Sequence, residues 1–213
     1  MEIMDRLRQE RIIAIVRGLK SNLMLDLAQS LCDGGIHLME VTFNQASPHS
    51  WKDTAGAIAA TTREFADVMA IGAGTVMNVE QVQMACEAGA RYIVSPNACE
   101  TVIRETKRLG MSSFPGALTP TEIALAHDAG ADAVKIFPAG NLGPGYIKAL
   151  KAPLGHIDLI AVGGINENNA GSFVHNGAMA VGVGGNLVNR DWIEQGEFAK
   201  ITRLAKEYAK AVR

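Results

Sequence analysis

The sequence predicts an α/β protein, a (β/α)8 TIM barrel with a short N-terminal helix, on the strength of three observations. Short runs rich in Val and Ile recur along the chain, and a longer stretch with helical spacing follows each of them. The runs are apolar on both faces, which is typical of a parallel sheet covered by helices. The joints that lead from each helix into the next strand repeat one pattern. Together these features predict eight βα units.

The expected strands follow one another at regular spacing. They lie at 12–16 (IIAIV), 38–43 (LMEVTF), 68–74 (VMAIGAG), 92–96 (YIVSP), 112–116 (SSFPG), 133–138 (AVKIFP), 157–164 (IDLIAVGG) and 180–185 (AVGVGG). A helix candidate follows each run. The last one, 198–213, places six apolar residues on one face, enough to cover the outside of a barrel. These are Phe198, Ile201, Leu204, Ala205, Tyr208 and Val212.

The connections from helix to strand share one sequence pattern, in which a glycine ends the helix, a small residue follows and a strand begins. Four examples are DGGIHLMEV, EAGARYIV, DAGADAVKI and HNGAMAVGV. Glycine supplies the left-handed conformation that ends a helix. Strand order cannot be read from one sequence, so an open doubly wound sheet is the alternative architecture. Eight regular units favour closure and leave no room for a second domain, so we expect residues 1–213 to form one barrel domain.

The charge balance and the cysteines exclude several classes of protein. Twenty Lys and Arg stand against 22 Asp and Glu, for a net charge of −2. No basic patch suits nucleic acid or an anionic membrane. An anionic ligand must therefore be bound by a few local groups and not by the overall charge of the protein. No apolar stretch reaches the roughly 18 residues of a membrane span. Three scattered cysteines, Cys32, Cys86 and Cys99, argue against a disulfide framework, and we expect a cytoplasmic protein.

The strongest candidates for chemistry are a lysine and a glutamate inside apolar strands. Side chains at the carboxyl ends of barrel strands form the active site of this fold. Lys135 lies within AVKIFP and Glu40 within LMEVTF. Burial lowers the pKa of an amine, and a neutral amine attacks carbonyl carbons. Each residue alone has a structural explanation, a lysine that reaches solvent or an ion pair between the two. As a pair on opposite sides of the barrel, they predict a Schiff-base lysine faced by a proton-transfer acid.

Glycines and one arginine at other strand ends are candidates for binding a carboxylate and a phosphate. Gly74 and Thr75, in IGAGTV, are suited to cradle a carboxylate, although glycine at a strand end is usually a turn. Arg17 closes the first strand and can bind a carboxylate or phosphate, or remain solvated. The loops after the last two strands are the habitual phosphate site of this fold. They carry Gly163, Gly164, Gly184 and Gly185.

A metal site is not expected. Four of the histidines, His37, His127, His156 and His175, fall on helices or at the amino ends of strands. His49 lies on the active side but without an HxxxH pattern or paired carboxylates beside it. Cys99 has no histidine near it in the sequence, so we interpret it as an inert cysteine at a helix start.

The motifs LMEVTF, IGAGTV, IVSPN, FPG, KIFPA and the pair GGI and GVGGNL occur in this order across nearly the whole chain. In combination they resemble the 2-keto-3-deoxy-6-phosphogluconate (KDPG) and 4-hydroxy-2-oxoglutarate (KHG) aldolases and their 6-phosphogalactonate relatives. The resemblance implies a class I aldolase that needs no metal or other cofactor and forms a homotrimer. It implies that Lys135 forms the Schiff base, that Glu40 is the acid and base, and that the substrate-binding residues are Arg17, Thr42, Gly74, Thr75, Pro96 and Phe137.

Three departures from the gluconate-type pattern bear on the sugar acid. Asn44 stands where many such members have an arginine, Gly185 where many have a serine, and Val162 where they tend to have a threonine. Val162 and the stretch FPAGNLGPGYIKALKAPL look like the galactonate type, whereas EVTF and GVGGNL look like the gluconate and oxoglutarate group. We expect cleavage of KDPG to pyruvate and glyceraldehyde 3-phosphate. The alternatives are the galactonate epimer or 4-hydroxy-2-oxoglutarate and, more distantly, a sugar-phosphate isomerase or epimerase or a non-catalytic phospho-ligand barrel.

Overall fold

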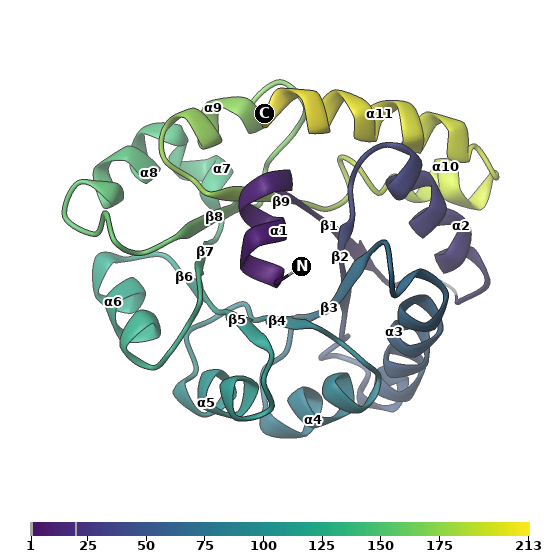
Figure 1. Cartoon of the computed structure of the whole chain (residues 1–213), viewed down its shortest axis with the longest axis horizontal. Helices are drawn as coiled ribbons and strands as arrows, with labels where there is room; N and C mark the ends of the chain where they lie inside the picture. The colour runs from purple at the N-terminus through teal and green to yellow at the C-terminus, as the bar shows by residue number, and fades with distance from the viewer. Residues whose placement is uncertain (1, 20) are drawn as a thin grey trace.

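The computed structural model describes residues 2–19 and 21–213. Strands and helices alternate along the chain, and Figure 1 shows the strands as an inner ring with the helices outside it. The strands are β1 (Ile12–Arg17), β2 (Leu38–Thr42), β3 (Ala70–Gly74), β4 (Tyr92–Val94), β5 (Ser112–Phe114), β6 (Gly116–Ala117), β7 (Val134–Ile136), β8 (Leu159–Val162) and β9 (Ala180–Val183). The helices are α1 (Ile3–Glu10), α2 (Ser21–Asp33), η1 (Pro48–Ser50), α3 (Trp51–Phe65), α4 (Val79–Glu87), α5 (Glu100–Arg108), α6 (Pro120–Asp128), α7 (Ala139–Leu142), α8 (Pro144–Lys151), α9 (Ala170–His175), α10 (Arg190–Glu194) and α11 (Phe198–Ala211).

The sheet is parallel and its two ends meet. Its strand order is β5-β4-β3-β2-β1-β9-β8-β7-β6. Strands β5 and β6 are successive in the chain, and Pro115 alone separates them. The backbone N–H of Ser95 donates to the carbonyl of Phe114 on one side (3.2 Å), and that of Lys135 donates to the carbonyl of Pro115 on the other (2.8 Å). Residues 112–117 are therefore one interrupted strand. With β5 and β6 counted as one, the barrel has eight strand positions, each called a stave below. Its closure confirms the predicted (β/α)8 barrel over the open sheet.

Each expected strand is present, but most are shorter than the apolar run that predicted them. The run at 157–164 forms a strand only from Leu159 to Val162. It ends there because Gly163 and Gly164 have left-handed backbone angles (φ +89° and +73°) that no strand continues through. Two helices, α7 and α8, follow the sixth stave, and α10 and α11 follow the eighth, where the sequence predicted one each. The extra short helices lie in the loops that lead away from the active end.

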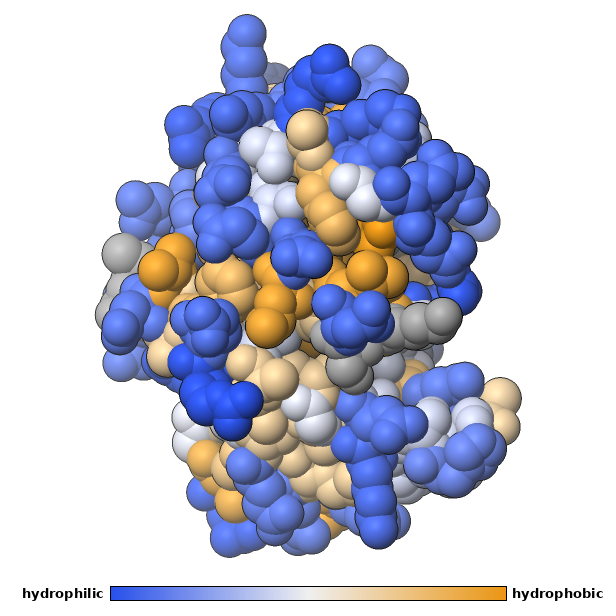
Figure 2. Space-filling view, turned by 90° about the vertical axis from the view of Figure 1, so that its right-hand side faces the viewer, coloured by the Kyte–Doolittle hydropathy of each residue, from blue (hydrophilic) through white to orange (hydrophobic). Residues whose placement is uncertain are grey.

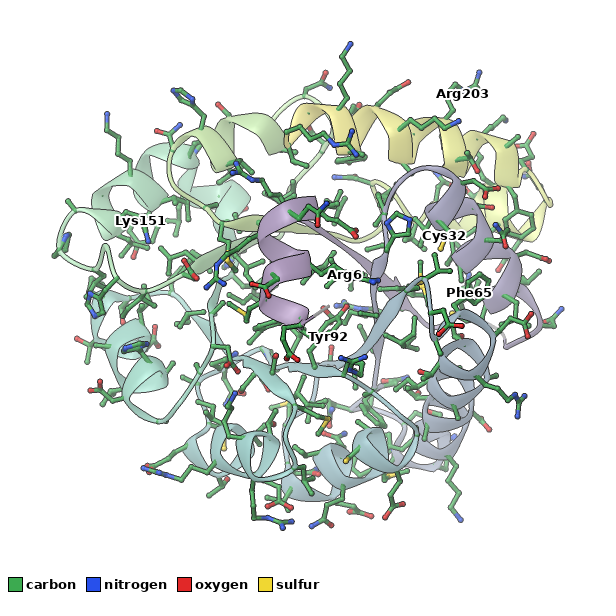
Figure 3. All side chains as sticks on the ribbon, viewed as in Figure 1. Arg6, Cys32, Phe65, Tyr92, Lys151 and Arg203 are labelled. Atoms are coloured by element: carbon green, nitrogen blue, oxygen red, sulfur yellow. The ribbon has the colours of Figure 1, made fainter. Side chains whose placement is uncertain are left out.

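The helix α1 closes the amino-terminal mouth of the barrel. It crosses the centre of the ring in Figure 1. Its residues Ile3 and Leu7 join the apolar cluster inside the barrel, together with Tyr92 and Phe114, whose ring centroids lie 5.5 Å apart. Figure 3 shows Tyr92 beside the start of α1, within the ring, whereas Arg203 lies at the outer rim. Because described side chains fill this end, the carboxyl ends of the strands are left as the entrance for a ligand.

A second and larger apolar cluster fills the layer between the sheet and the outer helices. It explains why strand residues are apolar on both faces, since one face meets the barrel interior and the other meets the helices. Figure 2 looks onto the side of the barrel that carries α2 and α3 in Figure 1. Most of that surface is hydrophilic, but apolar residues gather across its middle and lower part. Among the described residues, no helix has the length and apolar character that a membrane crossing requires.

Candidate active site

Glu40 and Lys135 come from opposite staves of the barrel. Glu40 is the middle residue of β2, paired in register with Gly72 of β3, and Lys135 is the middle residue of β7, paired with Gly116. In the strand order, three staves separate β2 from β7 in either direction. Both side chains are buried, with 2% of Glu40 and 8% of Lys135 exposed. They line one cavity, so the pairing expected from the sequence is present in the structure.

Burial dominates the proton affinity of both groups. It raises the pKa of the Glu40 carboxyl above its usual range, and the positive charges of Lys135 and Arg17 oppose this shift. Burial lowers the pKa of the Lys135 amine, and the negative charge of Glu40 opposes that shift. No ion pair within 4.0 Å holds either side chain in the described part of the chain, so the ion-pair explanation is not supported. A buried acid and a buried amine with these shifts are typical of a functional site.

Gly74 makes room for the carboxylate of Glu40. A Cβ atom at position 74 would lie 1.7 Å from Oε1 of Glu40, closer than any real contact. Gly74 does not line the cavity itself, so the structure places it behind Glu40 and not on the cavity wall. Gly72 makes room in the same way in the adjacent layer of the barrel, where a Cβ would lie 2.2 Å from the ring of Tyr92. The glycines of the IGAGTV motif therefore shape the barrel interior around two large inward side chains.

The cavity that holds Glu40 and Lys135 measures about 850 Å³. The other expected substrate residues, Arg17, Thr42, Thr75, Pro96 and Phe137, line it as well. The Lys135 Nζ atom lies 5.2 Å from the centroid of the Phe137 ring.

The hydroxyl of Thr42 is buried, and no residue in the described chain bonds to its Oγ1 atom. Buried polar groups in proteins are nearly always paired. An unpaired one on a cavity wall, two residues after Glu40 on the same strand, is suited to bind a polar atom of a ligand.

A second cavity of about 560 Å³ adjoins the first and shares Arg17, Phe137 and Val162 with it. The four expected phosphate-binding glycines line it: Gly163, Gly164, Gly184 and Gly185. Gly140 approaches this loop closely, because its N–H donates to the carbonyl of Gly163 (2.8 Å) and a Cβ there would lie 2.7 Å from the same oxygen. The two cavities together form one long site with a reactive end and a glycine-rich end.

The sequence reasoning missed several polar residues at the two cavities. Gln45 lines the first, and Asn186 and Arg190 line the second. The Asn186 side chain also donates to the carbonyl of Ile165 (2.7 Å) and so connects the two glycine loops. These residues lie beyond the strand ends, in loops where polar side chains are the rule. The one sequence signal that could have identified them is their position just after a strand, and this signal alone selects too many residues.

The structure offers little for metal or thiol chemistry elsewhere. Across residues 2–19 and 21–213, no three His, Cys, Asp or Glu side chains gather in a way that could hold a metal ion. The three cysteines are free thiols. A hydrogen bond with the Thr101 hydroxyl lowers the pKa of Cys99, but Cys99 lines neither cavity.

Comparisons with known proteins show the family to which the chain belongs. The aldolase family described as KDPG and KHG aldolase matches residues 3–204. The 2-dehydro-3-deoxy-6-phosphogalactonate aldolase of Escherichia coli (strain K12) is 36% identical over 202 residues, 94% of this chain and 96% of that protein. The 2-dehydro-3-deoxy-phosphogluconate aldolase of Treponema pallidum (strain Nichols) is 37% identical over 207 residues, covering 96% and 95%. The prefixes 2-dehydro and 2-keto denote the same group.

A solved structure gives the same result at the level of the fold. The KDPG aldolase from Legionella pneumophila superposes with a TM-score of 0.86 at 25% identity over 97% of both chains, and it holds pyruvate captured as a covalent carbinolamine intermediate. The relatives are aldolases, which favours that activity over an isomerase or a non-catalytic barrel. The chain therefore belongs to the KDPG and KHG aldolase family of lyases.

Proposed function

We propose that this chain cleaves KDPG to pyruvate and glyceraldehyde 3-phosphate through a Schiff base on Lys135, with Glu40 as the proton-transfer group. One observation carries the proposal: a buried amine and a buried carboxyl, neither held in an ion pair among the described residues, face each other across one cavity. The covalent carbinolamine of pyruvate in the Legionella relative supports it, because that intermediate requires an amine nucleophile.

The first half of the reaction forms the iminium ion. The neutral Nζ of Lys135 adds to the C2 ketone, which gives a carbinolamine. Glu40, whose proton affinity is increased because burial raises its pKa, donates a proton to the C2 hydroxyl, which leaves as water. The product is a cationic iminium, and Glu40 is left as a carboxylate. The lowered pKa of Lys135 keeps a fraction of the amine neutral and therefore reactive.

The second half breaks the carbon–carbon bond. The Glu40 carboxylate takes the proton of the C4 hydroxyl, the C3–C4 electron pair moves into the iminium, and glyceraldehyde 3-phosphate leaves. The remaining enamine is protonated at C3 by Glu40. Addition of water to the iminium then releases pyruvate and the free amine. One carboxyl group serves all these steps because they alternate between giving and taking a proton.

We assign the two ends of the substrate to the two cavities. The carboxylate of the keto acid would lie at the reactive end with Thr75, Pro96 and Phe137, and Thr42 would pair its free hydroxyl with the substrate. The phosphate would lie in the second cavity, where Gly163, Gly164, Gly184 and Gly185 offer backbone N–H groups. Arg17 lines both cavities and would neutralise charge at either end.

The galactonate epimer is the second candidate substrate, since one relative is a 6-phosphogalactonate aldolase and Val162 lines both cavities. A threonine at position 162 could bond to the C4 hydroxyl of one epimer, whereas valine cannot. We expect cleavage of both epimers, with kcat/KM values within roughly 100-fold, as the absence of one polar contact predicts. Val162→Thr should shift the preference toward the gluconate epimer. Steady-state kinetics on both epimers measures this.

Val174→Thr on α9 is the matched control and should leave the ratio unchanged. Each epimer is assayed with and without the phosphate, because the proposed phosphate site requires it for efficient turnover. A strong natural preference that Val162→Thr does not move would place recognition elsewhere, at Asn44 or Arg17. Equal turnover of unphosphorylated substrates would favour 4-hydroxy-2-oxoglutarate as the physiological type of substrate.

The proposed reaction needs no metal, because the iminium itself accepts the electrons that a divalent ion would otherwise stabilise. We expect full activity after prolonged dialysis against EDTA, measured as pyruvate released per minute. The control is the same enzyme dialysed without chelator. A loss that Mg²⁺, Mn²⁺ or Zn²⁺ restores would contradict the Schiff-base mechanism.

We also propose a homotrimer in the cytoplasm. The trimer rests on the family resemblance, and the apolar residues gathered on one side of the barrel in Figure 2 offer a surface for a second copy. The free thiols of Cys32, Cys86 and Cys99 accord with a reducing compartment. Light scattering coupled to size exclusion tests the trimer, for which the expected mass is about three times that of the 22.6 kDa chain.

A further inference from the structure

Thr75 adopts a backbone conformation that its side chain disfavours. Its φ is +55°, in the left-handed region, where β-branched residues are rarely found. Among the described non-glycine residues, Arg11 is the one other case, and it ends α1 and lines neither cavity. Such a conformation persists only where the surroundings hold it, and residues of this kind cluster at functional sites.

Two glutamine side chains form a hydrogen-bonded chain that ends on Thr75. Nε2 of Gln45 donates to the carbonyl oxygen of Thr75 at 2.5 Å. Nε2 of Gln81, on α4, donates to Oε1 of Gln45 at 3.1 Å. Oε1 of Gln81 accepts from the N–H of Met77 at 2.8 Å, so the same side chain also holds the loop beyond Thr75. Gln81 is fully buried.

The hydrogen-bonded pair Gln45 and Gln81 connects two regions of the proposed active site. Gln45 follows β2, the strand that carries Glu40, and Thr75 follows β3. Both residues line the cavity with Lys135. A fully buried amide whose two ends are both bonded leaves few alternative arrangements of the loop. We propose that Gln45 and Gln81 are positioning residues that hold Thr75 in the conformation in which it binds the carboxylate of the keto acid. This inference rests on the proposed function.

The test measures the binding of the keto acid apart from the sugar chain. Borohydride trapping is run over a range of pyruvate concentrations, which gives a half-saturating concentration and a maximal rate. Gln45→Ala should raise the half-saturating concentration roughly tenfold, as the loss of one hydrogen bond of ordinary strength predicts. The maximal rate should stay within about threefold, because the reacting groups are untouched. Gln45 is half-buried in a loop, so the fold tolerates its truncation.

The matched control is Gln83→Ala, on the same helix, whose Nε2 donates to Glu105 at 3.0 Å outside the barrel. It should change neither value. Gln81→Met keeps the volume and removes the bonds to Gln45 and Met77. The double variant Gln45→Ala/Gln81→Met should raise the half-saturating concentration by less than the product of the two single increases, because the two side chains are coupled through their shared hydrogen bond. A wild-type half-saturating concentration in Gln45→Ala overturns the inference. A wild-type enzyme that pyruvate and borohydride do not modify overturns the proposed function instead.

Discussion

Replacement of Lys135 by arginine is expected to abolish cleavage and to leave the fold intact. Arginine keeps its positive charge in proteins and forms no imine with a ketone, so the covalent pathway is lost. The loss should be about 10⁴-fold or more, as for other removals of a nucleophile. Borohydride in the presence of pyruvate should add one reduced pyruvyl group to the wild-type chain, at Lys135, and none to Lys135→Arg. Peptide mass spectrometry identifies the labelled residue.

The matched control is Lys107→Arg. Lys107 binds both oxygens of Asp132 at 2.7 Å on the outside of the barrel, where arginine replaces it without loss. This variant should keep wild-type activity and wild-type labelling. Label on any other lysine, or cleavage that persists in Lys135→Arg, would refute the Schiff-base assignment. Circular dichroism and the melting temperature establish that the inactive variant is folded.

The rate of labelling should also depend on pH in a definite direction. Only the neutral amine adds to the ketone, and burial lowers the pKa of Lys135 from the ordinary lysine value of 10.5. The trapping rate should therefore rise with pH and reach half its maximum below 10.5. A midpoint at or above that value would mean that the amine is stabilised in its charged form, which excludes it as the resting nucleophile.

The barrel could be predicted from the sequence because its signals are local and repeated. Runs apolar on both faces, such as 12–16, indicate strands covered on both sides, and a glycine ends the helix before several of them. Closure is different, because it depends on contacts between residues far apart in the chain. The fifth stave shows this: Pro115 interrupts it, and its two halves bond to different neighbours. Regular repetition of the units was sufficient evidence for closure, but it did not predict this break.

The reactive pair could be predicted because a charged residue inside an apolar strand is conspicuous. Glu40 and Lys135 contradict their surroundings in the sequence, and the structure buries both at one cavity. The role of Gly74 could not be predicted, since a strand-end glycine serves a turn, a ligand or a neighbouring side chain equally well. The contact with Glu40 becomes visible only when β2 and β3 lie side by side. Gln45 was missed for a related reason: its significance lies in the backbone angle of Thr75, thirty positions away.

Replacement of Glu40 by glutamine should preserve the shape of the site and remove proton transfer. We expect cleavage to slow by about 10²–10⁴-fold, the usual contribution of a general acid and base. Imine formation with pyruvate should survive at a reduced rate, because Lys135 is still present. The negative charge of Glu40 raises the pKa of Lys135, so its loss should move the half-maximal pH of borohydride labelling downward. Borohydride labelling quenched at a series of times measures imine formation, and steady-state kinetics measures cleavage.

The pH dependence of the free energy of unfolding is a second test of the Glu40 carboxyl. Because the folded pKa of Glu40 is raised, the folded chain keeps a proton that the unfolded chain loses near the ordinary value of 4.5. The carboxyl's contribution to the free energy of unfolding is therefore full below that pH and falls as pH rises toward the folded pKa. Glu40→Gln should remove this fall, whereas Glu100→Gln on the surface of α5 should keep it and keep full activity. Near-normal turnover in Glu40→Gln would mean that another residue moves the protons and that Glu40 serves only the packing around Gly74.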